Sequence, residues 1–161
     1  LSQKLINMSD LILDNGIYRS KENNLPISGK VHNIYRGKRF MMGNLINGKK
    51  EGPWMEWHPI QRQLRETYKD GHLDGSVSLF YKNGQREWRY TYNNGILDGA
   101  YTKWYKNGVK AVDGWFENGE PKGIWAWWDE DGNIIKSEKF ERLTRGINDQ
   151  HNEYIHRELT H

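Results

Sequence analysis

Four basic side chains recur at a fixed place in the sequence and are the first candidates for chemistry. Arg39, Arg62, Arg86 and Lys110 follow one another at intervals of 23, 24 and 24 residues, each just after a short turn. Guanidinium and ammonium groups bind carboxylates and phosphates, and Arg is among the residue types that anchor protein interfaces. The column therefore predicts a surface that binds anionic groups of a partner.

Aromatic residues accompany the basic column. If Asn83 and Gly84 are the two central residues of a tight turn, the strands on either side pair residue by residue and their alternate side chains share a face. The predicted pairs on one face are Tyr81 with Arg86, Leu79 with Trp88, and Val77 with Tyr90. The predicted partner-binding residues are the four cations and the rings beside them: Tyr81, Trp88, Tyr90, Tyr105 and Trp127.

A structural role is the alternative interpretation of the same cations. Arg86 would cover the ring of Tyr81, and Lys110 would cover that of Tyr105, in local cation–π contacts. The two interpretations are compatible, because a cation that lies on a ring can still present N–H groups to a partner.

The remaining polar residues do not predict a catalytic or metal site. Glu51, Asp74 and Asp98 each precede a glycine of a repeated link, where acidic residues favour turns. The chain has no Cys, no P-loop, and no hydrolase or zinc-protease motif. The histidines near the C-terminus (His151, His156 and His161) lack acidic or thiol partners in a ligand motif. We therefore expect no enzyme activity, no metal and no cofactor.

An internal repeat positions all of these residues. Its first glycines are Gly29, Gly52, Gly75, Gly99 and Gly123, which are spaced by 23, 23, 24 and 24 residues. A period of this length is typical of repeat proteins. Asn-Gly between strand-forming residues, as in YKNGQ, predicts a two-residue hairpin turn with positive φ at both positions. Each repeat is therefore expected to be one β-hairpin, with shortened turns in the first two repeats.

Large side chains line up from one repeat to the next. The three columns are Val31, Trp54, Val77, Tyr101 and Trp125; Ile34, Trp57, Phe80, Trp104 and Trp128; and Leu45, Tyr68, Tyr92, Phe116 and Phe140. An isolated hairpin is marginal in water, so neighbouring hairpins are expected to bury these rings against one another. The predicted fold class is all-β: a single-layer, curved antiparallel sheet of about five stacked hairpins. Residues 29–140 form the repeats, 1–28 an N-terminal capping segment, and 141–161 a C-terminal cap or flexible tail.

Composition agrees with a folded binding protein. The hydrophobic share is 35% and the mean hydropathy is −0.98, but 8 Trp and 9 Tyr argue against disorder. The 24 basic and 21 acidic side chains nearly balance, so nucleic-acid binding is not expected. We expect a cytoplasmic protein, with a periplasmic or lipid-anchored precursor left open because the chain begins at Leu1.

The repeat resembles the MORN repeat, in the variant found in the bacterial YwqK-type antitoxin family. The shared pattern is glycine, an aromatic pair, a Tyr-x-Asn-Gly turn, and a further aromatic residue and glycine, from Gly29 to Phe140. Asn15 to Val31 resembles that family's opening segment. The resemblance implies a sheet of stacked hairpins and a role in binding and neutralising a toxin protein.

Two functions follow from these observations. The first is a non-enzymatic scaffold, an antitoxin or immunity protein that binds and occludes a cognate toxin. The alternative is a membrane-associated MORN module whose basic column binds anionic lipid headgroups weakly. The sequence leaves open the identity of the partner, the binding face and the oligomeric state.

Overall fold

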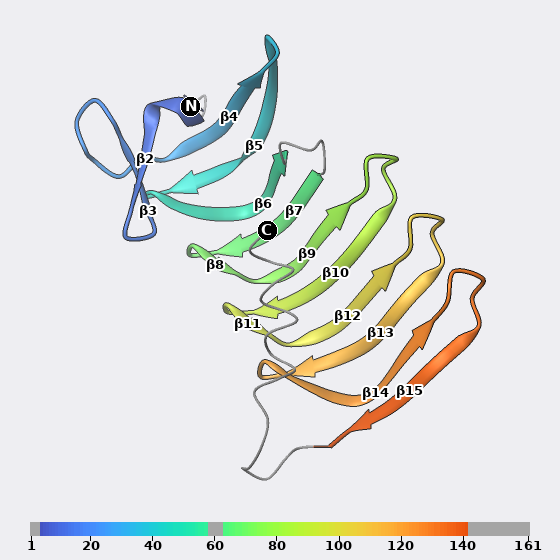
Figure 1. Cartoon of the computed structure of the whole chain (residues 1–161). Helices are drawn as coiled ribbons and strands as arrows, with labels where there is room; N and C mark the ends of the chain where they lie inside the picture. The colour runs from blue at the N-terminus through green and yellow to red at the C-terminus, as the bar shows by residue number, and fades with distance from the viewer. Residues whose placement is uncertain (1–3, 58–62, 142–161) are drawn as a thin grey trace.

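The computed structural model of the chain describes residues 4–57 and 63–141. They form an open sheet of consecutive antiparallel hairpins (Figure 1), so the predicted fold class is confirmed. The strands of this sheet are β1 (Leu5–Asn7), β4 (Gly29–Tyr35), β5 (Lys38–Ile46), β6 (Lys49–Trp57), β7 (Gln63–Lys69), β8 (His72–Leu73), β9 (Gly75–Phe80), β10 (Arg86–Asn93), β11 (Ile96–Leu97), β12 (Gly99–Trp104), β13 (Lys110–Glu117), β14 (Glu120–Trp128) and β15 (Ile134–Phe140). A 3₁₀ turn, η1 (Met8–Asp10), and a small hairpin of β2 (Leu11–Asp14) and β3 (Ile17–Ser20) complete the described part.

Five long hairpins follow one another in the sheet in the order in which they occur in the chain. They are β4–β5, β6–β7, β9–β10, β12–β13 and β14–β15. Each begins at one of the repeat glycines or a few residues before it. One period of the sequence is therefore one hairpin, and the repeat translates along the sheet.

Two-residue turns join each hairpin to the next at one end of the sheet. Asn94 and Gly95 have φ of 48° and 82° and are flanked by the pair Asn93 and Ile96. Both residues are left-handed, as a type I′ turn requires. Three other links have the same geometry: Asn47–Gly48, Asp70–Gly71 and Asn118–Gly119. The Gly95 N–H also donates to the carbonyl of Leu73 in the preceding repeat, at 2.7 Å.

At the other end of the sheet, the predicted two-residue turn at Asn83 and Gly84 is wrong. Only Gly84 has a positive φ, 84°. The loop spans Tyr81 to Gln85: the Gly84 N–H donates to the Tyr81 carbonyl, and the Tyr81 N–H donates to the Gln85 carbonyl. Asn83 Oδ1 accepts from the Gln85 N–H at 3.1 Å, which stabilises a type I turn followed by a left-handed glycine.

The Tyr and Asn of this turn tie the third hairpin to the fourth, and the fourth to the fifth. Their contacts cross 23 residues: Tyr81 Oη to the Trp104 carbonyl and Tyr105 Oη to the Trp128 carbonyl, both 2.8 Å, and Asn83 and Asn107 Nδ2 to the carbonyls of Lys106 and Glu130, 3.2 and 2.9 Å. In the last repeat Asp129 takes the place of the Tyr and accepts hydrogen bonds from its own turn, from the N–H groups of Asp131 and Asn133. The Tyr-x-Asn-Gly pattern is therefore a link between repeats.

One face of the sheet, called the core face here, carries the hydrophobic core. The first predicted column (Val31, Trp54, Val77, Tyr101 and Trp125) is buried throughout. The third column packs beside it, with Leu45 and Phe116 exposed by only 0 and 1%. The Tyr101 ring stacks on Trp125 with centroids 5.3 Å apart. The expectation that stacked rings replace a globular core is confirmed for these two columns.

Two glycines without a positive φ make room for tryptophan on the core face. A Cβ on Gly43 would lie 2.5 Å from the ring of Trp54, and one on Gly114 would lie 2.2 Å from that of Trp125. Each indole N–H donates to a carbonyl of the glycine's strand. At the matching places in the second and third repeats, the larger residues Glu66 and Tyr90 face Val77 and Tyr101, which are smaller than Trp. Core packing is thus adjusted repeat by repeat.

Residues 4–28 lie against the first hairpin. β1 pairs with β4 in parallel, and Ile6 and Leu11 are buried with Val31 and Trp54. The Tyr18 N–H donates to the Gly48 carbonyl at 2.7 Å. This segment therefore covers the exposed edge of β4 and closes the core at that end.

Candidate functional site

The face opposite the core carries a row of rings and cations, which we call the ladder face. Its rings belong to the second predicted column, and within the described residues they are Phe80, Trp104 and Trp128. Its exposed cations include Arg65, Arg86, Arg89 and Lys110. Side chains alternate between faces along a strand, so the strands that bury Val77 and Tyr101 present these rings on the other side.

Three of the ladder-face cations, Arg65, Arg86 and Lys110, each lie on a ring. Arg65 Cζ is 4.7 Å from the Phe80 ring centroid, and Arg86 Cζ lies 5.7 Å from Phe80 and 5.5 Å from Trp104. Lys110 Nζ is 5.5 Å from the Trp128 ring. Such contacts contribute about 0.5–1 kcal/mol at exposed sites. They hold the cations in place while Arg65 and Arg86 remain exposed, and Arg65 Nε also donates to Gln63 Oε1 at 3.0 Å.

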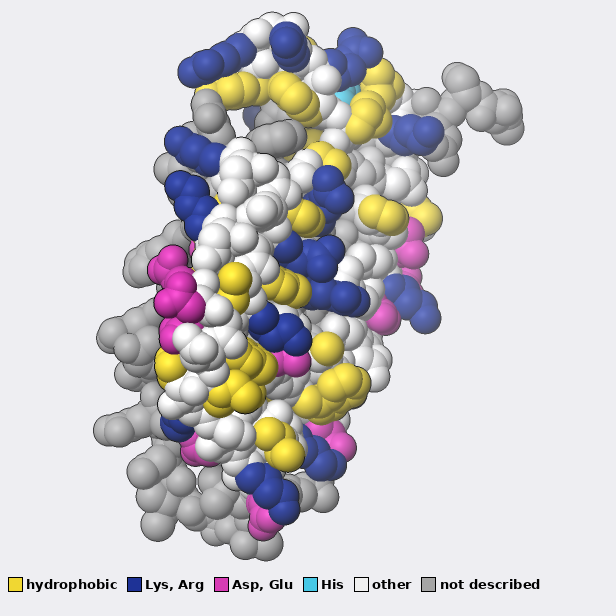
Figure 2. Space-filling view, turned by 90° about the vertical axis from the view of Figure 1, so that its right-hand side faces the viewer, with side chains coloured by type: hydrophobic (Ala, Val, Ile, Leu, Met, Phe, Trp, Pro, Cys, Tyr) yellow, Lys and Arg dark blue, Asp and Glu magenta, His cyan; other side chains and the backbone are white. Residues whose placement is uncertain are grey.

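Few acidic groups neutralise the ladder face. Lys110 forms an ion pair with Asp113, 3.0 Å between Nζ and Oδ2. Within residues 4–57 and 63–141, no carboxylate lies within ion-pair distance of Arg65 or Arg86. Figure 2 shows basic side chains alternating with hydrophobic ones in a strip along the molecule. The surface is thus suited to carboxylate or phosphate groups beside apolar contacts.

The three described members of the predicted basic column lie on one face, but not on the predicted one. Arg39, Arg86 and Lys110 pair across the strands with Ile34, Phe80 and Trp104. The predicted pair of Tyr81 with Arg86 is wrong because the register shifts at Glu87, between Arg86 and Trp88. This β-bulge turns Arg86 onto the face opposite Trp88 and Tyr90. Arg62 and His58 lie outside the described residues.

The predicted aromatic partners of the column have structural roles. Trp88 and Tyr90 are 6 and 2% exposed and belong to the core, and the predicted pairs Leu79–Trp88 and Val77–Tyr90 are confirmed. Trp127 packs beside the core under Lys136 Nζ, 4.8 Å from its ring. The predicted cation–π contacts of Arg86 with Tyr81 and Lys110 with Tyr105 are replaced by those with Phe80, Trp104 and Trp128.

A groove adjoins the ladder face where β5 and β6 separate. These strands pair only at Asn44 with Glu51, Leu45 with Lys50 and Ile46 with Lys49. Beyond these pairs they diverge (Figure 1), and a groove of about 740 Å³ lies there, lined by residues of β5, β6 and β7 that include Met41, Met55 and Arg65. Arg65 is shared with the ladder face, so the two form one continuous surface.

A partly buried charged cluster on the core face was missed by the sequence interpretation. Lys50 Nζ lies 2.8 Å from Glu56 Oε1, 3.7 Å from Glu66 Oε2 and 3.4 Å from the Tyr68 hydroxyl. It also lies 4.7 Å from the Trp54 ring. The sequence does contain a signal for this cluster, because charged residues replace large apolar or aromatic ones of other repeats. Lys50 stands where other repeats have Leu73 and Leu97, and Glu66 stands where the third repeat has Tyr90.

Burial dominates the electrostatics of this cluster. It raises the pKa of the Glu66 carboxyl above its ordinary value, and the nearby Lys50 charge offsets only part of this effect. Burial alone would lower the pKa of Lys50, but the hydrogen bond and charge of Glu56 raise it above its ordinary value. Burial likewise raises the pKa of the Tyr68 phenol. The cluster therefore favours a protonated Lys50 and resists ionisation of Glu66.

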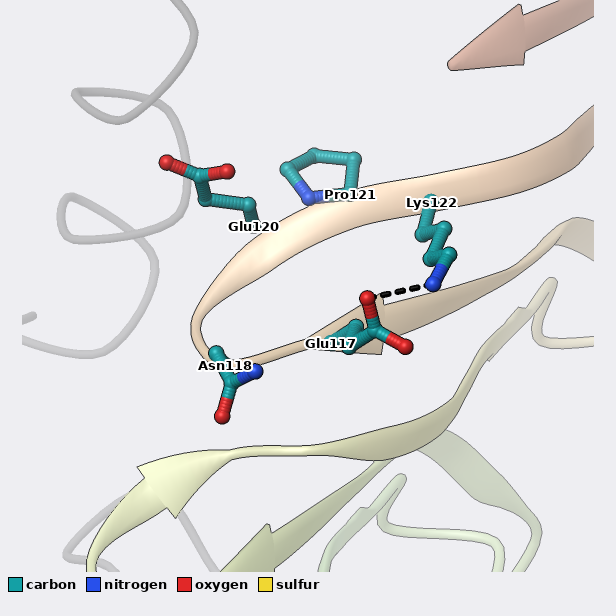
Figure 3. A pocket seen from close by; sticks show the side chains of 5 residues that line it. All are labelled: Glu117, Asn118, Glu120, Pro121 and Lys122. Carbon is teal, nitrogen blue, oxygen red and sulfur yellow. Dashed lines mark hydrogen bonds and ion pairs between the residues drawn. The ribbon is translucent and has the colours of Figure 1, made fainter. Parts of the chain in front are cut away.

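A second, smaller pocket lies at the turn between β13 and β14 (Figure 3). Its volume is about 180 Å³, and its lining is Glu117, Asn118, Glu120, Pro121 and Lys122. The Lys122 ammonium forms an ion pair with the Glu117 carboxylate across it. These two charges satisfy each other, so the pocket offers little to a ligand.

The chain matches no protein-family model, and no curated protein is similar to it in sequence. In the described part of the chain, no group of three or more His, Asp or Glu side chains is placed to hold a metal ion. No helix within residues 4–57 and 63–141 is long and apolar enough to cross a membrane. The C-terminal histidines lie outside the described residues.

Proposed function

We propose that this protein is a non-enzymatic scaffold that binds a partner protein through the ladder face. The single observation that carries the proposal is the row of exposed cations, three of which are held on rings of the sheet. Following the resemblance to YwqK-type antitoxins, the partner is a toxin whose active surface the scaffold covers.

Preorganisation supports a binding role for this face. Arg side chains lose conformational entropy when a partner immobilises them, and the rings of Phe80 and Trp104 already restrict Arg65 and Arg86. Flat rings next to cations supply both apolar area and charge-assisted hydrogen bonds, the combination that dominates many interfaces. A partner that presents carboxylates between apolar residues complements this pattern.

Co-expression with the product of the neighbouring gene tests the proposal. We expect the two proteins to purify as a complex, and the scaffold to restore growth of cells that the neighbour's product inhibits. The variant Arg86→Ala should weaken the complex by about tenfold or more, as expected for an interface Arg that contributes above 1 kcal/mol. Absence of both a complex and protection would contradict the proposal.

Binding to anionic membranes is the second candidate, favoured by one observation. Trp115 is 51% exposed and pairs with Ala100 on the same face as the cations, an arrangement that suits a membrane interface. Each basic group near an anionic surface contributes about 1 kcal/mol. Co-sedimentation of the protein with phosphatidylserine vesicles at low salt measures this binding. If the protein does not sediment with the vesicles at low salt, this candidate is excluded.

A further inference from the structure

The outer halves of β5 and β6 are strand edges that lack each other as partners. At the other junctions between hairpins, the strands pair in this outer region: Gln63–Arg65 of β7 with β9, and Trp88–Arg89 of β10 with β12. Among the described strands, only β5 and β6 separate there. Pro53 lies just beyond their last pair and has no N–H to donate.

The backbone of β5 directs hydrogen-bonding groups into the groove. Tyr35 and Lys38 flank the two-residue turn of Arg36 and Gly37, both left-handed. The pair that flanks such a turn is hydrogen bonded, and bonded and non-bonded pairs alternate along an antiparallel ladder. Arg39 and Met41 therefore direct their N–H and C=O groups away from β4 and toward β6.

The side chains of the groove suit an extended polypeptide. Met41 and Met55 lie on the ladder-face side of their strands, and methionine adapts to different apolar partners. Both charges are represented in the lining, by Lys30 and Arg65 and by Glu51 and Glu66. The side-chain carbonyl oxygen of Asn44, at the closed end of the groove, is buried and has no hydrogen-bond partner among the described residues.

We propose that this groove accepts an extended strand of the partner protein, which adds to the sheet between β5 and β6. This inference rests on the proposed role in protein binding. Main-chain hydrogen bonds to the free edges supply affinity, and apolar side chains at alternate positions of the strand contact Met41 and Met55. The segment is about five or six residues long, the usual length of a strand.

A phage-displayed library of short linear peptides, selected on the intact protein, tests the strand site without the cognate partner. We expect selected peptides to carry apolar residues at every second position. Hydrogen–deuterium exchange should then show the amides of Arg39 and Met41 in β5 exchanging at least about tenfold more slowly with peptide than without. A failed co-purification with the neighbouring gene's product would leave this result unaffected, so the two proposals fail separately.

Two matched variants sharpen the test. Met41→Glu places a charge in the groove and should weaken the selected peptides about tenfold. Ile46→Glu changes a residue of the same strand with similar exposure (49% against 46%) in the half that is paired with β6, and should change affinity less than about twofold. Circular dichroism verifies that both variants fold. If Met41→Glu does not fold, the exchange measurement on the natural protein decides.

The proposal of a strand-binding site is contradicted if no peptide is selected, or if the selected peptides protect amides outside β5 and β6. It is also contradicted if Ile46→Glu weakens peptide binding as much as Met41→Glu.

Discussion

At the scale of single residues, the charged cluster around Lys50 departs most from the repeat. Removing one partner of a buried ion pair leaves an uncompensated charge and is strongly destabilising. Lys50 and Glu66 are 13 and 12% exposed as side chains, so solvent screens them little. The cluster interrupts the apolar columns where the cores around Trp54 and Tyr90 meet.

We predict that Lys50→Met lowers the free energy of unfolding by about 3 kcal/mol. The triple variant Lys50→Leu, Glu56→Leu, Glu66→Tyr, which copies the residues of the third repeat at these positions, should recover most of this loss because it removes all three charges. Urea unfolding measures both. A triple variant no more stable than Lys50→Met would show that the charges do not govern the stability of this region.

The raised pKa of Glu66 predicts how stability depends on pH. The folded state holds a proton on Glu66 more readily than the unfolded state does. Its contribution to stability is therefore complete below the ordinary Glu pKa of 4.5, and it is lost as the pH rises through the higher folded pKa. We expect Glu66→Gln to gain stability relative to the natural protein as the pH rises from about 4.5 to neutrality. Urea unfolding at both pH values measures the difference in free energy of unfolding between Glu66→Gln and the natural protein. The same difference at both pH values would contradict the prediction.

At the scale of elements, the turns decide which side chains meet. The sequence predicted the hairpins and their period because the glycine spacing determines them directly. Of the three columns of large side chains that it predicted to be buried, the first and third form the core, and the second lies on the ladder face. It did not predict the face of Arg86, because the extra residue Glu87 in a β-bulge reverses the side-chain direction. The groove was also unpredictable from the sequence, since it depends on where β5 and β6 stop pairing.

Tyr105 tests the link between hairpins. Tyr105→Phe removes the hydrogen bond from its hydroxyl to the Trp128 carbonyl and should lower the free energy of unfolding by about 1 kcal/mol. The matched control is Tyr35→Phe, at the same position of the first repeat, where the ring is 53% exposed; we expect a change below about 0.5 kcal/mol. Equal effects, measured by thermal unfolding, would rule out a special role for the link.

Gly114 tests the fit between glycine and tryptophan. Its φ is not positive, so the cost of Gly114→Ala arises from the clash with Trp125, and we expect a loss of about 2 kcal/mol. In the background Trp125→Val, which copies Val77, the same change should cost at least about 1 kcal/mol less. A double-mutant cycle measures this coupling, and a coupling near zero would mean that the ring does not limit this position.

At the scale of the whole molecule, the proposed function assigns stability and recognition to opposite faces of the sheet. The core face buries Trp and Tyr columns, while the ladder face carries exposed cations and adjoins the groove lined by Met41 and Met55. Of the predicted partner-binding rings, Trp88, Tyr90 and Trp127 lie on the core face and Tyr81 and Tyr105 belong to the turns, while the described cations lie on the ladder face. Register shifts in the hairpins, between Arg86 and Trp88 in the third and between Lys103 and Trp104 in the fourth, explain why these cations lie opposite the core.

The affinity of the partner complex for two charge-matched double variants tests this separation most directly. Arg65→Ala with Arg86→Ala removes two cations from the ladder face, and Lys82→Ala with Lys106→Ala removes two exposed cations from the hairpin turns. With the neighbouring gene's product as ligand, isothermal titration should show the first pair weakening binding by a hundredfold or so, and the second by less than about threefold. Equal weakening by both, or none by the first, would contradict recognition through the ladder face.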